Sequence, residues 1–187
     1  MADCRDSLWS LDFFRCESIA LRSHWVMVVM DIYSRRIIGF GVCTTLSGQV
    51  ACQMFNRIIA GKTLPQYLCM DNDPVFRYHR WVANLAILEI EPVRSIPCVP
   101  RSHPYVERLI GTIRREFLDH TLFWNERDLL RKLDQFRHYY NHSRGHLGLD
   151  GITPDKKANN EQVTKRPLTS YSWQSHCNGL FVSPVAV

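Results

Sequence analysis

Apolar and polar positions in the first quarter of the chain follow the pattern of short β-strands. Runs rich in β-branched and aromatic residues cover positions 8–14, 25–30 and 36–44, and short polar segments separate them. Consecutive runs of this length with short connections are typical of neighbouring antiparallel strands. We therefore predict that the fold begins with a three-stranded antiparallel meander.

The period then changes to that of a helix. Val50, Met54 and Ile58 recur at helical spacing, with Ser47 as a candidate N-cap and Gly61 as a stop. In chain order, the remaining predicted elements are strand 67–70, helix 75–86, strand 88–96, helix 104–117 and helix 125–140. Early antiparallel strands followed by strand–helix crossovers predict an α/β fold with a five-stranded mixed sheet and helices on both faces.

Length and composition fit one compact unit with an appendage. We assign residues 1–150 to the α/β core and residues 151–187 to a basic C-terminal tail that ends in a short apolar segment. The net charge of +5 permits a polyanionic partner. The chain has 18 Arg and only 5 Lys, and the planar guanidinium suits phosphate. GC-rich codon usage is the alternative explanation of this bias.

The seven cysteines and the apolar runs exclude several classes of protein. No two cysteines form a Cys-x-x-Cys pair, which argues against a disulfide framework and a zinc knuckle. No apolar run reaches the roughly 20 residues needed to cross a bilayer, and no basic leader begins the chain. We therefore expect a cytoplasmic protein with no membrane partner.

Three carboxylates stand in contexts that suit metal-dependent chemistry on phosphodiesters. Asp12 lies inside the first apolar run, Asp71 ends the strand predicted at 67–70, and Glu107 lies at the start of a predicted helix. Carboxylates that converge at strand ends supply the hard oxygen ligands that Mg²⁺ requires. A pair of such ions can activate an attacking oxygen and stabilise a leaving one.

Each acid also has an ordinary structural explanation. Asp12 could face water on an edge strand, Asp71 could be a turn aspartate, and Glu107 could be a solvated glutamate favoured by the helix dipole. Asp73 is a rival to Asp71, and we interpret Asp31 as turn chemistry. The three candidates are therefore judged together.

The predicted helix 104–117 carries bases beside its acid. At 100° per residue, Glu107 and Arg114 share one flank, whereas Glu116 lies on the opposite flank. Arg108, Arg114 and Arg115 are candidate phosphate contacts, and a solvated helix face with acidic partners at positions 116 and 119 is the alternative.

Taken together, five segments resemble the integrase-like catalytic core of the DDE transposases of bacterial insertion sequences and of retroviral integrases. The matching segments are residues 10–13, 31–39, 70–72, 104–116 and 140–149, and the resemblance covers residues 8–155. It implies a ribonuclease-H-like fold and two divalent cations, Mg²⁺ or Mn²⁺, held by Asp12, Asp71 and Glu107. Water would hydrolyse a phosphodiester at an element end, and the freed 3′-hydroxyl would attack target DNA.

The resemblance also implies partners. These are DNA, both element ends and target, and a second copy of the chain in a homodimer or higher oligomer. The usual helix-turn-helix region does not precede the first strand, so we expect a fragment, a truncated copy, or a core that works with a separate helix-turn-helix subunit. Asp73-Pro74 replaces a common glycine after the second acid, and Gly145 replaces a common proline before His146.

Several interpretations stay open from the sequence. Asn141, Arg144 and His146 either contact DNA or close the loop after the last helix, and Trp81, Trp124 and Trp173 are expected in the core or as lid residues. One alternative function is a catalytically idle DNA-binding remnant. The other is a glycosyltransferase that uses Asp71-Asn72-Asp73 as an Asp-x-Asp motif.

Overall fold

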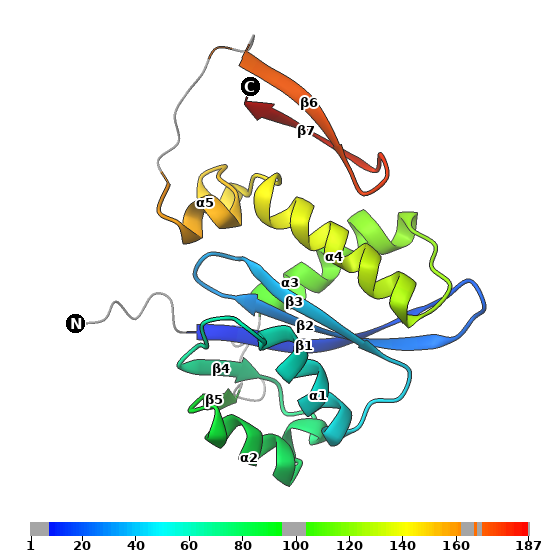
Figure 1. The fold of residues 1–187 in the computed structure, drawn as a ribbon, viewed down its shortest axis with the longest axis vertical. Helices are drawn as coiled ribbons and strands as arrows, with labels where there is room; N and C mark the ends of the chain where they lie inside the picture. Colours follow the sequence, from blue (N-terminus) through cyan, green and yellow to red (C-terminus); the bar gives the residue numbers. More distant parts are fainter. Residues whose placement is uncertain (1–7, 95–103, 162–166, 168–169, 187) are drawn as a thin grey trace.

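The protein is built on one five-stranded mixed sheet. The computed structural model describes residues 8–94, 104–161, 167 and 170–186. The strands lie in the order β3-β2-β1-β4-β5, with β1, β2 and β3 antiparallel and β4 and β5 parallel to β1 (Figure 1). The predicted mixed sheet is therefore confirmed. Its strands are β1 (Leu8–Glu17), β2 (Ser23–Asp31), β3 (Ile37–Cys43), β4 (Tyr67–Met70) and β5 (Glu91–Arg94).

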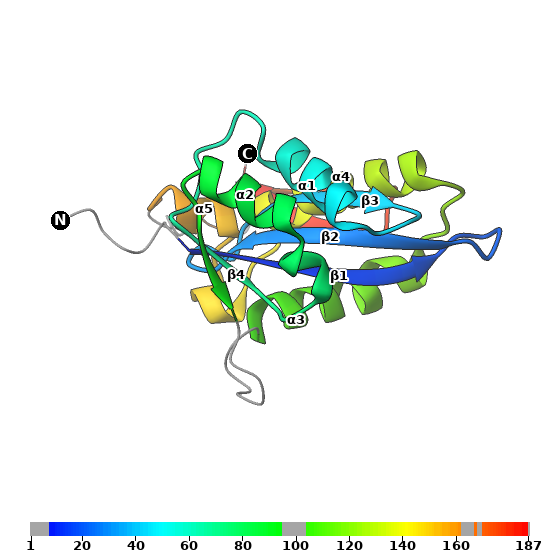
Figure 2. The same ribbon diagram turned by 90° about the horizontal axis from the view of Figure 1, so that it is seen from below.

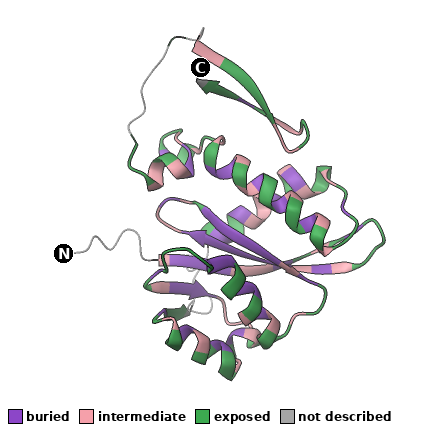
Figure 3. Ribbon diagram, in the orientation of Figure 1, coloured by how far each residue is buried: buried purple, intermediate pink, exposed green. Residues whose placement is uncertain are grey.

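Four helices cover the two faces of this sheet. Figure 2 shows α1 and α2 on one side of β1 and α3 on the other, and α4 packs on the same face as α3. Helices on both faces were predicted, and they leave β2 and β3 almost completely buried, whereas residues 91–93 of β5 and the end of β1 are exposed (Figure 3). The helices are α1 (Gly48–Ile59), α2 (His79–Ile87), α3 (Pro104–Thr112) and α4 (Glu126–His142).

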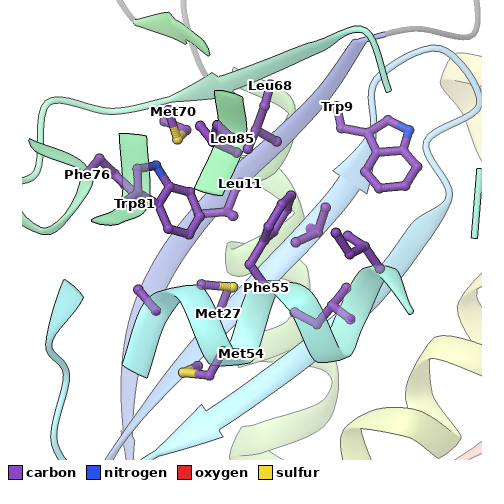
Figure 4. Packing of buried hydrophobic residues seen from close by; sticks show 14 of the residues in the cluster. Trp9, Leu11, Met27, Met54, Phe55, Leu68, Met70, Phe76, Trp81 and Leu85 are labelled. Atoms are coloured by element: carbon purple, nitrogen blue, oxygen red, sulfur yellow. The ribbon is translucent and has the colours of Figure 1, made fainter. Parts of the chain in front are cut away.

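Each face has its own hydrophobic core. The core under α1 and α2 centres on Leu11, Phe55 and Trp81 (Figure 4), and the rings of Phe55 and Trp81 lie 5.3 Å apart. The core under α3 and α4 includes Phe14 of the central strand and Phe136 of α4. Since successive side chains of a strand point to opposite faces, β1 feeds both cores.

Two predicted helices are broken in the structure. The segment predicted at 75–86 begins with a 3₁₀ turn, η2 (Pro74–Arg77), before α2. The segment predicted at 104–117 is α-helical only to Thr112 and continues as the π-helix η3 (Ile113–Phe117) and a 3₁₀ turn, η4 (Leu118–His120). Ile113 and Phe117 are both buried, so the wider turn keeps two apolar side chains in the core.

The tail is more ordered than its polar sequence indicates. It contains the short helix α5 (Pro154–Ala158) and a hairpin of β6 (Tyr171–His176) and β7 (Phe181–Ala186). The hairpin lies on the side of α4 away from the sheet (Figure 1), where the rings of Tyr139 and Phe181 stack 4.2 Å apart. The predicted apolar end segment is thus a strand. In the described part of the chain, no helix has the length and apolarity needed to cross a membrane.

The cysteines in the described residues are free thiols. They are Cys16, Cys43, Cys52, Cys69 and Cys177, as expected from their scattered spacing. Burial raises the pKa of Cys16, Cys43 and Cys177 to about 11. Such thiols are protonated at neutral pH and act as small hydrophobic side chains.

Candidate functional site

Asp12 lies on the central strand of the sheet. β1 has β2 on one side and β4 on the other, and Asp12 pairs with Val28 of β2. A water-facing edge-strand position for Asp12 is therefore wrong. One carboxylate oxygen accepts a hydrogen bond from the backbone N–H of Phe13 at 2.7 Å. The side chain is partly buried. Partial removal of its charge from water costs folding free energy, and an aspartate on the surface has no such cost.

The strand register predicts where Asp71 lies relative to Asp12. β1 and β4 are parallel, with Trp9 opposite Leu68 and Ser10 opposite Cys69. The paired residues end there, and Asp71 directly follows Met70, the last residue of β4. Continued by two residues, the same register would set position 12 opposite position 71. Residues opposite each other in register point to the same side of a sheet, so we expect the two carboxylates on one face.

That face is the one covered by α3. Phe14, two residues after Asp12 on β1, belongs to the core under α3 and α4, whereas Leu11 belongs to the opposite core. Because the alternation has a period of two, Asp12 points toward α3 as Phe14 does. The sheet therefore presents Asp12 to the helix that carries Glu107, and the continued register predicts the same for Asp71.

Glu107 lies in the first turn of α3, and the helix geometry indicates which part of β1 it lies near. At the other end of this flank, Arg114 donates to the backbone O of Arg15 at 3.2 Å, and its guanidinium lies 5.5 Å from the Phe14 ring centre. Glu107 lies seven residues before Arg114, which is about 10 Å along the helix axis. The same distance along a strand is about three residues, which leads back from Arg15 to Asp12. Figure 2 shows α3 lying along β1, so the flank of Glu107 faces the neighbourhood of Asp12.

The side chain of Glu107 does not close the site. It is exposed, and within residues 8–94 and 104–161 no three His, Cys, Asp or Glu side chains come close enough to hold a metal ion. The described structure therefore shows no assembled three-acid site, and Asp12, Asp71 and Glu107 remain predicted ligands. Their carboxylates are of the chemical type that fits Mg²⁺ or Mn²⁺, because these ions require hard oxygens.

The rival acids are used by local turns. The Asp31 carboxylate accepts hydrogen bonds from the backbone N–H of Tyr33 at 3.2 Å and of Ser34 at 3.1 Å, and from the Ser34 hydroxyl. Asp73 caps η2 by accepting from the backbone N–H of Val75 at 2.8 Å. The interpretation of Asp31 as turn chemistry is confirmed. Asp71 also accepts a turn hydrogen bond, from the backbone N–H of Asp73 at 3.1 Å, and it is preferred to Asp73 because it directly follows β4.

The bases on the helix divide between its two flanks. Arg108, Arg114 and Arg115 are exposed. Glu116 instead pairs with Arg144, whose Nη2 and Nε donate to its carboxylate at 2.7 and 3.2 Å. This ion pair is consistent with the predicted placement of Glu116 away from the Arg114 flank. It also corrects the expected local pairing of Glu116 with helix arginines. The three exposed arginines remain predicted DNA contacts.

The remaining open residues separate into core and surface. Asn141 is buried and hydrogen-bonded to the backbone of Ile37, so its structural interpretation is confirmed. Trp81 lies in the core, as expected. Trp124 and Trp173 are 66% and 75% exposed, so a core position is wrong for both. An isolated tryptophan carries no periodicity that would show which side faces water.

Comparison with known sequences places the chain in a family. A family model described as an integrase core domain matches residues 2–100, more than half of the chain. The chain belongs to the integrase core domain family. A second model with the same description matches residues 88–154. The glycosyltransferase interpretation of Asp71-Asn72-Asp73 is therefore abandoned.

A curated relative comes from a bacterial insertion element. The "Insertion element IS476 uncharacterized 39.2 kDa protein" of Xanthomonas euvesicatoria is 24% identical over 152 residues, which cover 81% of this chain and 44% of the relative. The chain thus spans less than half the length of that protein. The family and this relative confirm the resemblance to an insertion-sequence transposase core.

Solved structures show the same fold. The chain matches an intasome of simian T-cell lymphotropic virus with a TM-score of 0.70 and 16% identity, over 96% of this chain and 66% of that one. It matches the HTLV-2 integrase catalytic core domain in complex with magnesium at 0.62 and 15%, over 80% and 93%. It matches the BIV integrase catalytic core domain at 0.62 and 20%, over 84% and 99%. The predicted ribonuclease-H-like fold is confirmed.

Proposed function

We propose that this chain is the catalytic core of a DNA transposase of a bacterial insertion sequence. It would hydrolyse a phosphodiester at an element end and transfer the freed 3′-hydroxyl to target DNA. The observation that supports the proposal is the parallel β1–β4 register, which, continued past its last pair, would set Asp12 beside Asp71 on the face that α3 covers. Membership of the integrase core domain family supports the same reaction class.

The three acids act together in this proposal. Asp12, Asp71 and Glu107 would hold the divalent cations of a two-ion site. The chemistry that Mg²⁺ or Mn²⁺ supplies when bound is charge stabilisation of the attacking and leaving oxygens. Three clustered carboxylates repel one another unless a cation offsets their charge, so the proposed site depends on the bound ion.

Arginines would hold the DNA strand over these acids. Arg114 is predicted on the Glu107 flank and reaches β1 at Arg15, about 10 Å along the helix from Glu107, where it would contact a backbone phosphate next to the one at the acids. Arg108 and Arg115 are exposed on the same helix and extend the basic surface. Phosphate contacts of this kind fix the orientation of DNA without reading its sequence.

The assembly belongs to the same proposal. Element ends and target DNA are the partners, and strand transfer takes place in a homodimer or higher oligomer, with a separate helix-turn-helix subunit where the core does not carry one. The bacterial cytoplasm is the proposed location. A catalytically idle DNA-binding remnant is the second candidate, favoured by the exposed position of Glu107.

A cleavage assay on cognate element ends tests the proposal. Mg²⁺-dependent nicking is expected for the wild type and is expected to fall by about 10³-fold or more in Asp12→Asn, Asp71→Asn and Glu107→Gln, since each change removes a hard anionic ligand. Asp73→Asn is the matched control, because asparagine also caps a helical turn.

The assay also separates the two candidates. Full activity in any one of the three variants would remove that residue from the site. Binding of element ends by the wild type without cleavage in Mg²⁺ or Mn²⁺ would favour the idle remnant.

A further inference from the structure

A pocket of about 400 Å³ lies on the flank of α3 away from Glu107. One helical stripe of α3, formed by Tyr105, Leu109 and Thr112, lines it, and spacings of three and four residues keep these side chains on one side of the helix. Glu107 and Arg114 lie on the β1 flank instead. The pocket is therefore separated from the acids by the width of α3. Its other walls are Met30, Arg35, Arg108, Tyr140, Arg144 and residues 145–149.

Three arginines from three separate segments line this pocket. Arg35 comes from the β2–β3 turn, Arg108 from α3 and Arg144 from the segment after α4. Acidic residues are absent from the described lining. Arg144 is anchored by Glu116, which is not part of the lining, and its guanidinium lies 5.6 Å from the Tyr140 ring centre. The lining is therefore positive, with Arg35 and Arg108 as the charges that Glu116 does not offset.

Arg35 is fixed in place and incompletely paired. Its φ of +64° is in the left-handed region, which is costly for a residue with a side chain and persists only where the surroundings enforce it. The Asp31 carboxylate enforces it by binding the turn at Tyr33 and Ser34. The guanidinium lies 3.2 Å from the ring centre of Tyr105. Its Nη1 is buried and has no hydrogen-bond partner among the described residues.

His146 adds a neutral donor to the same cavity. Burial, together with the positive charges of Arg144 and Arg35, lowers the pKa of His146 to about 4, so the ring is uncharged at neutral pH. Its Nδ1 lies 3.4 Å from Nη1 of Arg144. In the tautomer in which Nδ1 accepts from this arginine, which only donates, the proton is on Nε2. That nitrogen is buried and has no hydrogen-bond partner among the described side-chain contacts.

We propose that the pocket of Arg35, Arg108, Arg144 and His146 binds a phosphate group of a DNA strand. The side chains of Arg35, Arg108, Arg144 and His146 all present hydrogen-bond donors. A phosphate group has several acceptor oxygens and would satisfy donors that are otherwise buried and unpaired. Guanidinium forks suit phosphate oxygens, and the tyrosine rings add flat surfaces for a sugar or base. The site is distinct from the proposed catalytic acids, and binding at it requires no catalysis.

The test measures DNA binding in EDTA, where no cleavage can occur, with a fluorescent duplex of about 20 base pairs in a salt series. Arg108→Gln and Arg35→Gln are each expected to weaken binding by about 10-fold and to reduce the salt slope by about one. Arg80→Gln, an exposed arginine of α2, is the matched control and should change affinity less than about 2-fold. Arg108 is exposed, so its variant keeps the test valid if Arg35→Gln fails to fold.

A second arm titrates inorganic phosphate by calorimetry. Phosphate binding to the wild type that is lost in Arg108→Gln, together with the weakened DNA binding, supports the proposal. Phosphate binding that depends on Arg108 while DNA affinity is unchanged assigns the pocket to a small phosphorylated ligand and overturns the DNA source. Wild-type behaviour of Arg108→Gln in both arms overturns the pocket altogether. Because metal and cleavage play no part, neither result depends on the three acids.

Discussion

The side-chain amide of Asn141 pairs with both backbone groups of Ile37. Its Oδ1 accepts from the Ile37 N–H at 2.9 Å, and its Nδ2 donates to the Ile37 carbonyl at 2.9 Å. Ile37 begins β3, the outer strand of the sheet, and both residues are buried. The amide thus takes the place of a neighbouring strand at this edge and joins α4 to the sheet.

Replacing this amide is expected to cost stability. Asn141→Ala leaves a buried N–H and a buried C=O unpaired, so the free energy of unfolding should fall by about 2–4 kcal/mol. Urea denaturation followed by circular dichroism measures it. Gln135→Ala, at an exposed position of the same helix, is the control and should stay within about 0.5 kcal/mol. A loss below about 1 kcal/mol for Asn141→Ala would show that water replaces the amide.

Much of the core fold could be predicted because its elements have strong local signals. The apolar runs gave the strands, and helical spacing such as that of Met54 and Ile58 gave the helices. The three acids could be selected from local context, but whether they meet could not be predicted from it. Whether Asp12 faces Asp71 depends on the β1–β4 register, and register is a relation between strands that no single segment contains.

The missed features have physical reasons of their own. The π-helix at Ile113–Phe117 depends on burying two side chains in a core that the sequence alone does not place. The left-handed backbone of Arg35 is set by the Asp31 turn, and arginine carries no preference for it. The tail hairpin did have a signal, since Asn178-Gly179 is a common turn pair. That signal was weak because the flanking strand Tyr171–His176 alternates poorly and is mostly exposed.

Divalent cations are expected to stabilise the wild-type protein through Asp12 and Asp71. A ligand that binds only the folded state stabilises it by mass action, and saturating Mg²⁺ or Mn²⁺ should raise the Tm by roughly 5 °C for a chain of this size. Asp12→Asn and Asp71→Asn should lose most of this shift, because each removes one of two adjacent anionic ligands. Differential scanning fluorimetry with and without EDTA measures the shift.

Asp73→Asn provides the internal comparison for this measurement. Asp73 lies two residues from Asp71 but caps η2 through the backbone N–H of Val75, and asparagine can make the same cap. Its cation-dependent shift should match that of the wild type. If the cation-dependent shift in Tm were lost in Asp73→Asn and retained in Asp71→Asn, Asp73 would be the metal ligand and Asp71 would not.

The tail hairpin is expected to be held to α4 through Phe181. The ring stacks on Tyr139 at an interplanar angle of 5° and lies 6.1 Å from Phe136. Phe181→Ala should therefore lower the free energy of unfolding by about 1–3 kcal/mol, the range for a partly buried aromatic side chain. Trp173→Ala, on the same hairpin but 75% exposed, should stay within about 0.5 kcal/mol. Equal effects in urea denaturation would contradict this docking.

His146 should make the protein less stable in weak acid. Burial first, and then the charges of Arg144 and Arg35, lower the pKa of His146 from 6.5 to about 4 in the folded state. Between these two values the unfolded chain binds the proton and the folded chain does not. The contribution of the neutral His146 ring to the free energy of unfolding is therefore complete above pH 6.5 and is lost as the pH falls toward 4.

The loss can be measured against a neutral replacement. Going from pH 7 to pH 5 should cost the wild type about 1–2 kcal/mol through this residue. His146→Gln removes the titrating ring, so its free energy of unfolding should fall less over the same interval. Urea denaturation at both pH values gives the two differences, and their comparison cancels the other titrating groups that the proteins share. Parallel curves for the two proteins would mean that His146 is as easily protonated in the folded chain as in the unfolded one.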